Sequence, residues 1–143
     1  MKKVLVAGAT GYLGQFVVMA LTARGYWVRA LGRSTAKLAP VEEHADELFI
    51  GEVTDPDSLG GLCDGIDIVF SSVGITRQKD GLTYNDIDYQ ANRNLLTIAE
   101  AAGVSQFMYV HVLNAEKLEH VAMVQAKQAF VDELERSGLD HTV

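Results

Sequence analysis

The sequence contains one cysteine, two prolines and no long hydrophobic run. The single Cys63 excludes an internal disulfide, which fits a chain that folds in a reducing cytoplasm. Four scattered histidines and this cysteine lack the spacing of metal ligands, so we expect no metal site. No apolar stretch approaches the length that spans a bilayer, and Met1-Lys2-Lys3 leads directly into an apolar strand without a signal peptide. We therefore expect a cytoplasmic protein that does not enter a membrane.

Acidic residues are also missing from one part of the chain, its first 41 positions. Six basic residues precede the first acidic one, namely Lys2, Lys3, Arg24, Arg29, Arg33 and Lys37. The net charge of −7 arises in the rest of the chain and disfavours nucleic acid, a polyanion, as a partner. A positive amino-terminal segment favours an anionic ligand near the start of the chain. The alternative interpretation is a scatter of surface charge.

The sequence does contain a glycine motif at its start, within Val4–Gly14 (VLVAGATGYLG). Gly8 lets the chain turn sharply off a strand, Gly11 removes a Cβ that would keep backbone N–H groups from a pyrophosphate, and Gly14 lets a helix pack on the strand. The helix N-terminus adds a partial positive charge. This pattern predicts the phosphate-binding turn of a dinucleotide-binding unit, and a turn without ligand is the alternative. The candidate contact residues are Gly8, Thr10, Gly11, Tyr12, Leu13 and Gly14.

The second strand predicts which dinucleotide binds. The strand Tyr26–Leu31 is followed by Gly32 and Arg33, where NAD-preferring folds place an Asp or Glu. A guanidinium pairs with a 2′-phosphate, which a carboxylate would repel. Arg33, helped by Ser34 and Lys37, therefore favours NADP(H), with NAD(H) as the second candidate. The alternative for Arg33 is a solvated loop residue.

Strands and helices alternate along the chain. The first helix is expected to bury the face formed by Leu13, Val17, Ala20, Leu21 and Arg24. Further strands are expected at 47–50, 67–70, 106–110 and 139–143, further helices at 35–45, from 55 onward, across 89–102 and at 118–137, and a polar loop at 76–85. Such alternation predicts a three-layer, doubly wound parallel α/β sheet, a Rossmann fold with strand order 3-2-1-4-5-6. We expect one NAD(P)-binding domain over residues 1–143, truncated at strand six, and hence an amino-terminal fragment without its substrate-binding portion.

These motifs together resemble the atypical branch of the short-chain dehydrogenase/reductase superfamily, over the whole chain. The resemblance rests on the glycine motif with Gly32-Arg33 and on Gly51–Asp55, Asp88–Asn92, Gly103–Val110, Ala126-Lys127 and Ser137–Thr142. The most similar groups are NmrA-like proteins, isoflavone-reductase-like enzymes and nucleotide-sugar-epimerase-like proteins. The resemblance specifies the superfamily and leaves the substrate and the oligomeric state open.

The resemblance also implies roles for single residues. The positions of Glu52 and Val53 border the adenine in similar proteins, and those of Ser71, Ser72, Val73 and Gly74 line the ribose and nicotinamide. For these four, small residues after a strand also suit a plain turn. The usual catalytic set is Ser, Tyr and Lys, with the Tyr four residues before the Lys. Here Lys127 matches the Lys, while Met123 stands at the Tyr position and His111 at the Ser position. A thioether cannot exchange the proton that carbonyl reduction by hydride requires, so the chain departs from Tyr-dependent reduction.

Two functions of different kinds remain open. The first is an NADP(H)-dependent oxidoreductase acting on a small molecule, in which Lys127 moves a proton or orients the nicotinamide ribose and His111 serves as acid or base. The second is an NmrA-like sensor that binds a dinucleotide without turnover, and a nucleotide-sugar-epimerase-like protein is a further alternative. His111 also has a structural alternative, as a hydrogen-bonded residue at the end of a strand.

Overall fold

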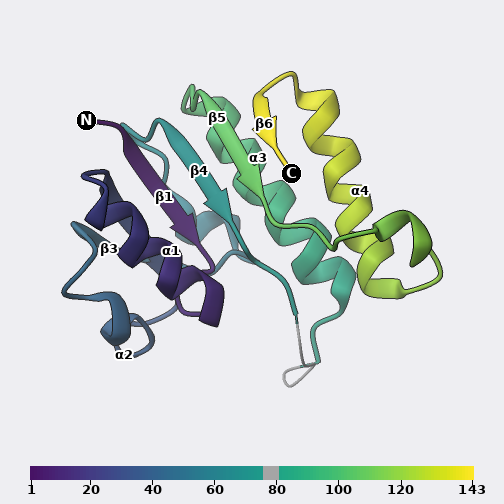
Figure 1. The fold of residues 1–143 in the computed structure, drawn as a ribbon, viewed down its shortest axis with the longest axis horizontal. Coiled ribbons are helices and arrows are strands. Elements are labelled where there is room, and N and C mark those ends of the chain that lie inside the picture. Colours follow the sequence, from purple (N-terminus) through teal and green to yellow (C-terminus); the bar gives the residue numbers. More distant parts are fainter. Residues whose placement is uncertain (76–80) are drawn as a thin grey trace.

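Residues 1–75 and 81–143 are described by the computed structural model of the chain (Figure 1). Within these ranges six strands form one sheet in the order β3-β2-β1-β4-β5-β6, and all neighbouring pairs are parallel. The strands are β1 Lys3–Ala7, β2 Trp27–Gly32, β3 Glu47–Ile50, β4 Ile68–Ser71, β5 Gln106–Tyr109 and β6 Asp140–Thr142. The predicted Rossmann strand order is confirmed. Residues 76–80 of the loop expected at 76–85 lie outside the described ranges.

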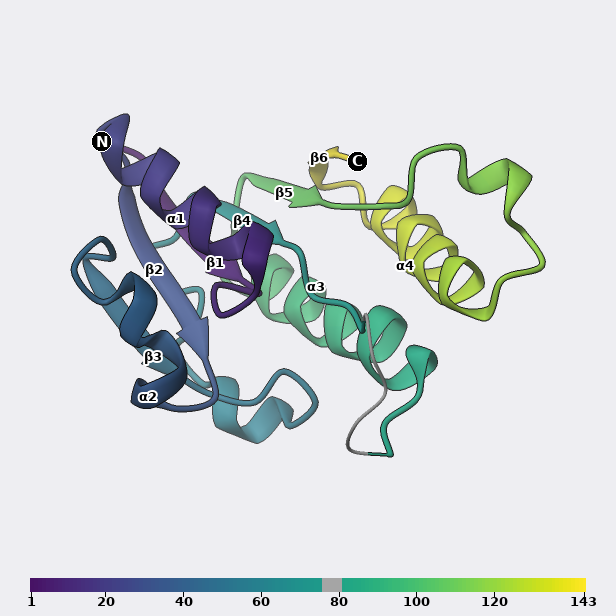
Figure 2. The ribbon, with the colours of Figure 1, turned by 60° about the horizontal axis from the view of Figure 1, so that its bottom comes forward.

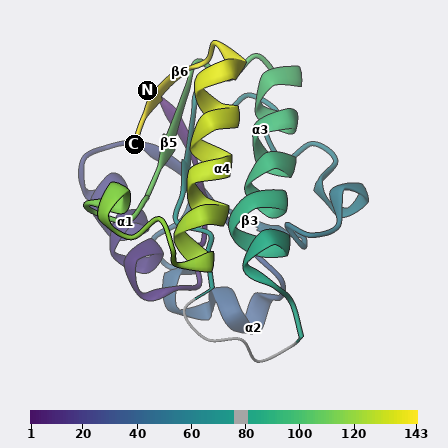
Figure 3. The same ribbon diagram turned by 90° about the vertical axis from the view of Figure 1, so that its right-hand side faces the viewer.

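Helices cover both faces of the sheet, which confirms the three layers. The helical segments are α1 Tyr12–Ala23, α2 Thr35–Leu38, η1 Ala39–Val41, η2 Pro56–Leu59, η3 Asn85–Ala91, α3 Asn92–Ala101, η4 Ala115–Lys117 and α4 Ala122–Ser137. The segment η3 is π-helical, and η1, η2 and η4 are short 3₁₀ turns. Figure 2 shows α1 and α2 on one face of the sheet, and Figure 3 shows α3 and α4 side by side on the other.

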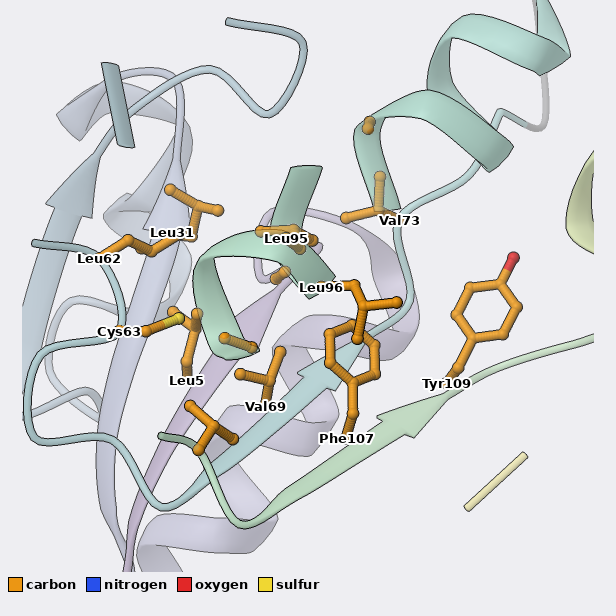
Figure 4. Close-up of a cluster of buried hydrophobic side chains, with 14 of the residues drawn as sticks. Leu5, Leu31, Leu62, Cys63, Val69, Val73, Leu95, Leu96, Phe107 and Tyr109 are labelled. Atoms are coloured by element: carbon orange, nitrogen blue, oxygen red, sulfur yellow. The ribbon is translucent and has the colours of Figure 1, made fainter. Parts of the chain in front are cut away.

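The central strand β1 contributes to a hydrophobic core on each face. Val4 and Val6 belong to the core under α1 and α2, whereas Leu5 and Ala7 belong to the core under α3 and α4. In Figure 4, side chains from β1, β4 and β5 (Leu5, Val69 and Phe107) face Leu95 and Leu96 of α3. Burial on both faces explains why β1 is a continuous apolar run rather than an alternating one.

Three helices are shorter than the sequence predicts. The segment at 35–45 contains only α2 and η1, because Pro40 has no N–H with which to continue an α-helix. The helix expected from Asp55 is the single turn η2, and Gly61 and Gly65 then take positive φ angles that end helical structure. The last helix begins at Ala122 instead of 118, after a turn in which Val121 N donates to the Leu118 carbonyl.

The side chain of Arg29 holds the β3–β4 connection in the absence of a longer helix there. Arg29 lies on β2 and is 9% exposed. Its guanidinium donates to the Glu47 carboxylate at 2.9 Å and to the backbone carbonyls of Leu62 and Asp64 at 2.6 and 3.2 Å. Charge-assisted hydrogen bonds of this kind are worth about 1.5–3 kcal/mol each. One guanidinium thus fixes the connection against the sheet.

Candidate functional site

The glycine motif forms a tight turn between β1 and α1 in which two glycines have no room for a side chain. Gly8 has a φ angle of +89°, and a Cβ there would lie 2.5 Å from Ser72 Oγ. A Cβ on Gly14 would overlap the carbonyl oxygen of Gly8, because α1 packs directly on the turn. These two positions need glycine for the fold itself.

Gly11 differs from its two neighbours in the motif. A Cβ on Gly11 would meet only the Gly8 carbonyl oxygen, at 3.4 Å. Its φ of −81° and ψ of 168° are open to any residue. The fold therefore tolerates a side chain at Gly11, and a glycine here suits a ligand that approaches the backbone.

The N-terminus of α1 offers an uncompensated positive end to this turn. No side chain caps the helix at Gly11, and the first turn contains no acidic residue. The first N–H groups of a helix have no acceptor within it, and they carry the positive end of the helix dipole. Because no side chain caps the helix, these N–H groups can bind an anion, while the nearby Gln15 Nε2 donates to the Thr10 carbonyl at 3.0 Å.

A cleft of about 640 Å³ opens from this turn along the carboxyl ends of β1 to β5. Open α/β sheets bind ligands at this edge, where the strand order reverses. The predicted site residues that line the cleft are Gly8, Thr10, Gly11, Tyr12, Leu13, Gly14, Arg33, Glu52, Val53, Ser72, Val73, Gly74 and Lys127. It is also lined by Leu31, Gly32, Gly51, Ile75, Leu82, Ile87 and Val110, which were not among the predicted site residues. A volume of this size is typical of small-molecule sites.

The side chain of Leu13 corrects one sequence expectation. Leu13 was expected on the buried face of α1, but it is 44% exposed and lines the cleft. The buried residues of α1 are Gly14 and Val18. Val17 and Leu21 of the expected face do pack against the core, whereas Leu13 and Arg24 at its two ends are exposed. At the start of the helix Gly14, which carries no side chain, takes the position in closest contact with the turn.

Three of the predicted contact residues lie outside the cleft lining. Ser34 caps α2, where its Oγ accepts a hydrogen bond from Lys37 N at 3.3 Å, and the Lys37 side chain is exposed. Ser71 is buried, and its Oγ donates to Asn92 Oδ1 at 2.5 Å. Each of these serines has a local structural partner.

The basic residues of the first 41 positions do not gather around the glycine turn. Lys3 begins β1 and Arg24 follows α1, so both lie at the end of their element that is remote from the turn. Arg29 is paired with Glu47. Of these six residues Arg33 alone lines the cleft, and its Nε lies 3.8 Å from Glu52 Oε2. The expectation that the basic residues of the amino-terminal segment surround the glycine turn is therefore wrong. Counting charges along the sequence does not show at which end of a strand or helix each residue lies.

The opposite end of the cleft contains a buried ion pair. Lys127 Nζ on α4 lies 3.2 Å from Oδ1 of Asp88 on η3, and the Asp88 side chain is fully buried. Oδ2 of Asp88 accepts a hydrogen bond from Ile75 N at 3.2 Å. Burial raises the pKa of the Asp88 carboxyl, and the Lys127 ammonium opposes that rise. Lys127 is the member of the pair that lines the cleft.

Sequence reasoning missed the importance of Asp88, although a signal for it was present. Asp88 and Asn92 lie four residues apart, on the helical face that continues into Leu95, Leu96 and Ala99. Both polar side chains are fully buried on that otherwise apolar face. Buried polar residues need partners, and Asn92 Nδ2 finds them in the carbonyls of Val73 and Asp88, both at 3.0 Å. The pair of polar residues on an apolar stripe could have marked this position.

A tyrosine hydroxyl does lie beside Lys127, but it comes from β5 and not from α4. Lys127 Nζ donates to Tyr109 Oη at 3.3 Å. Tyr109 is 3% exposed, and burial together with the Asp88 carboxylate raises the pKa of its phenol. Figure 4 shows Tyr109 at one end of the buried cluster, with its hydroxyl directed away from Phe107. This phenol is absent from the cleft lining, so it contacts Lys127 from outside the cleft.

His111 lies in a different hollow from Lys127. It lines a groove of about 690 Å³ between the 111–116 segment and α4, whose lining includes Leu113, Val124 and Val143. Gln128 Nε2 donates to Asp132 Oδ1 at 3.0 Å, so the Oε1 of Gln128 is left to accept from His111 Nε2, also at 3.0 Å. The predicted catalytic residues His111 and Lys127 therefore face different hollows.

Within residues 1–75 and 81–143 no helix has the length and apolar character required to cross a bilayer. The same described part of the chain contains no group of three or more His, Cys, Asp or Glu side chains arranged to hold a metal ion.

The strand order and the position of the cleft place the chain among Rossmann-type dinucleotide-binding proteins. Residues 8–143 match a family model described as NAD(P)H-binding, and the chain belongs to this family. The NAD(P)H-binding family implied by the sequence resemblance is thereby confirmed.

Curated relatives of the chain are considerably longer than 143 residues. Over 140 residues the chain is 31% identical to the photosystem II assembly factor Ycf39 of Cyanophora paradoxa, covering 98% of this chain and 43% of that protein. Over 115 residues it is 32% identical to the 3 beta-hydroxysteroid dehydrogenase/Delta 5-->4-isomerase of Mycobacterium tuberculosis H37Rv, covering 75% of this chain and 30% of that protein. The chain thus spans less than half the length of these relatives.

Solved structures share the fold at lower identity. A putative NAD-dependent epimerase/dehydratase from Bacillus halodurans superposes with a TM-score of 0.86 at 21% identity, over 99% of this chain and 68% of that one. WbmH of Bordetella bronchiseptica, solved in complex with NAD+, gives a TM-score of 0.78 at 22% identity, over 99% and 54% of the two chains.

Proposed function

We propose that the 640 Å³ cleft binds NADP(H) and that the protein is an NADP(H)-dependent oxidoreductase acting on a small molecule. The observation that carries the proposal is the contrast within the glycine motif. Gly8 and Gly14 are required by close packing, whereas Gly11 has space for a Cβ and faces the cleft at the uncapped end of α1. A diphosphate lying against the Gly11 backbone accounts for a glycine at this position.

The remaining lining residues fit the other parts of a dinucleotide. In this proposal Glu52 and Val53 border the adenine, Ser72, Val73 and Gly74 face the nicotinamide side, and Lys127 donates to the nicotinamide ribose. A bound nicotinamide supplies or accepts the hydride. The residues of this chain hold and orient the cofactor, and the Lys127 ammonium lies where it can hydrogen-bond a ribose hydroxyl or move a proton.

Arg33 carries the preference for NADP(H) in this proposal. Its guanidinium lines the cleft, is about half exposed and already lies near one carboxylate, Glu52. A 2′-phosphate offers Arg33 a doubly charged, bidentate partner in place of that 3.8 Å contact.

The test is to titrate NADPH and NADH into the wild type and Arg33→Ala by isothermal calorimetry. Loss of a charge-assisted phosphate contact, about 1.5–3 kcal/mol, should weaken NADPH binding roughly 10- to 100-fold. NADH binding should change less than about threefold. Arg24→Ala, an exposed arginine at the far end of α1, is the control. Equal losses for both dinucleotides would remove the preference for NADP(H).

A second candidate function is a dinucleotide sensor without turnover, and Met123 favours it. No phenol stands at the usual position on α4, and the Tyr109 phenol is buried outside the cleft lining. One group of relatives carries the name of an assembly factor rather than of an enzyme. The two functions separate in an assay of NADPH oxidation by the full-length gene product against a panel of carbonyl compounds. Turnover supports the oxidoreductase, and tight binding without turnover supports the sensor.

We also propose that residues 1–143 form the cofactor-binding domain of a longer cytoplasmic protein. The relatives extend well beyond the aligned region, and the groove beside His111 offers a surface for the rest of such a chain. For the compartment, the one cysteine, Cys63, is buried and cannot form an internal disulfide, which suits a reducing environment. The length of the parent reading frame tests the first part, and the location of a tagged full-length protein tests the second.

A further inference from the structure

The Asp88–Lys127 pair is unusual because both of its charges are withheld from water. The Asp88 side chain is 0% exposed and that of Lys127 is 12% exposed, with 3.2 Å between Oδ1 and Nζ. Desolvation makes each charge costly unless the other is present, so a pair of this kind is weak evidence for stability alone. The buried pair is better explained if Asp88 holds the Lys127 ammonium at a defined place.

The surroundings restrict where the Lys127 ammonium can lie. Besides Asp88 on η3, it contacts Tyr109 Oη on β5 at 3.3 Å and the Val110 carbonyl at 3.5 Å. It also lies 5.2 Å from the centre of the Tyr109 ring. Asp88 and Tyr109 are the titratable groups that contact it in the described part of the chain. The ammonium is thus held from two elements besides its own helix.

Gly74 brings this ion pair to the wall of the cleft. A Cβ on Gly74 would lie 2.6 Å from Asp88 Oδ1 and 3.0 Å from Lys127 Nζ. The cleft wall therefore has no side chain at the point where the pair lies behind it. Gly74 and Lys127 both line the cleft, whereas Asp88 does not.

The element that carries Asp88 is itself irregular. Asp88 lies within the π-helical segment Asn85–Ala91, which passes into α3 at Asn92. A π-bulge adds a residue to a helix and often occurs at functional sites. In this position η3 carries the carboxylate to Lys127, and α4 and η3 pack against each other.

We propose that Asp88 is a positioning residue for the bound dinucleotide: it holds Lys127 at the cleft wall beside Gly74 and keeps its amine protonated, as a donor to the ribose hydroxyls. The inference rests on the proposed function, because it assigns a partner to the lysine of the same cleft. Without Asp88, the buried amine would keep only the neutral partners Tyr109 and Val110. Burial without a counter-charge favours the neutral form of an amine, so Asp88→Asn should lose the charged donor more readily than the wild type as the pH rises.

The experiment measures NADPH affinity of the chain by calorimetry between pH 7 and 9, above the titration of the 2′-phosphate at about pH 6. Wild type should bind with nearly constant affinity over this range. Asp88→Asn should bind about tenfold more weakly at pH 7 and lose roughly another fivefold or more by pH 9. Lys127→Met should be about tenfold weaker without any such slope. Asp86→Asn, on the same segment, keeps an acceptor for Thr83 N and should resemble the wild type.

The double variant Asp88→Asn/Lys127→Met keeps the inference testable even if Asp88→Asn alone does not fold. Removing both charges leaves no unpaired ion, so the double variant should fold and should bind like Lys127→Met, with no additional loss. A folded Asp88→Asn protein with wild-type affinity and a flat pH profile would overturn the inference, as would a double variant with wild-type affinity. Failure of the wild type to bind NADPH or NADH at all would instead overturn the proposed function from which the inference starts.

Discussion

The two ends of the cleft are formed by different parts of the chain. At the glycine end, the backbone of Gly8–Gly14 and the N-terminus of one helix form the wall. At the lysine end, side chains from η3, β5 and α4 meet in a buried group of one carboxylate, one phenol and one ammonium. A backbone-built site depends on local conformation, whereas a side-chain-built site depends on how distant segments pack. The two ends should therefore respond differently to substitution and to pH.

The largest expected effect is on folding, at the glycine end. In Gly14→Ala the new Cβ would overlap the Gly8 carbonyl oxygen, and neither backbone can move aside cheaply. We expect a loss of about 3 kcal/mol or more in the free energy of unfolding, measured by urea denaturation. Gly60→Ala is the control, because a Cβ there meets nothing within 4 Å and should change stability by less than about 0.5 kcal/mol. Equal stability of the two variants would contradict the packing argument.

The next effect is on binding without an effect on folding. In Gly11→Val the new Cβ meets only the Gly8 carbonyl oxygen, at 3.4 Å, and the side chain takes up space next to the helix N-terminus in the cleft. We expect the thermal midpoint to stay within about 2 °C of the wild type, while NADPH affinity falls about 100-fold. Differential scanning fluorimetry with and without NADPH measures both. A variant that still binds NADPH normally would show that the Gly11 backbone does not face the cofactor.

The smallest expected effect is a pH dependence of stability, which we expect at the lysine end of the cleft and not at the glycine end. Because the pKa of Asp88 is raised above its unfolded value of 3.8, the folded state holds that proton more tightly than the unfolded state does. Its contribution to stability is full below pH 3.8 and is lost as the pH rises through the folded pKa. The free energy of unfolding of wild type, relative to Asp88→Asn/Lys127→Met, should therefore decline from pH 3.5 upward, as followed by urea unfolding at several pH values. A constant difference would mean that folding does not perturb Asp88.

The same contrast explains what the sequence could predict. The strand order and the glycine turn follow from short-range patterns, so β1, α1 and the residues Gly8–Gly14 were predicted in place. The side chains that contact Lys127 were not predicted. Asp88 and Tyr109 lie far from Lys127 in sequence, and they meet it only because η3, β5 and α4 pack together. The charge argument failed for a related reason, since Lys3 and Arg24 are near the turn in sequence but lie at the far ends of β1 and α1. The resemblance predicted Glu52 as a cofactor-binding residue. Its contact with Arg33 could be seen only in the folded structure.

The Arg29 guanidinium has a consequence for local opening of the molecule. It ties the carbonyls of Leu62 and Asp64 to β2, and the same connection carries Glu52 and Val53 of the cleft wall. Leu59 and Leu62 of this connection are also buried in the core, and Asn94 Nδ2 donates to the Val53 carbonyl at 2.9 Å. Release of the guanidinium would therefore loosen the backbone near Leu62 at a lower cost than global unfolding, without freeing the whole connection. We therefore expect the amide hydrogens near Leu62 to exchange before those of the glycine turn, and to exchange more slowly in the presence of NADPH.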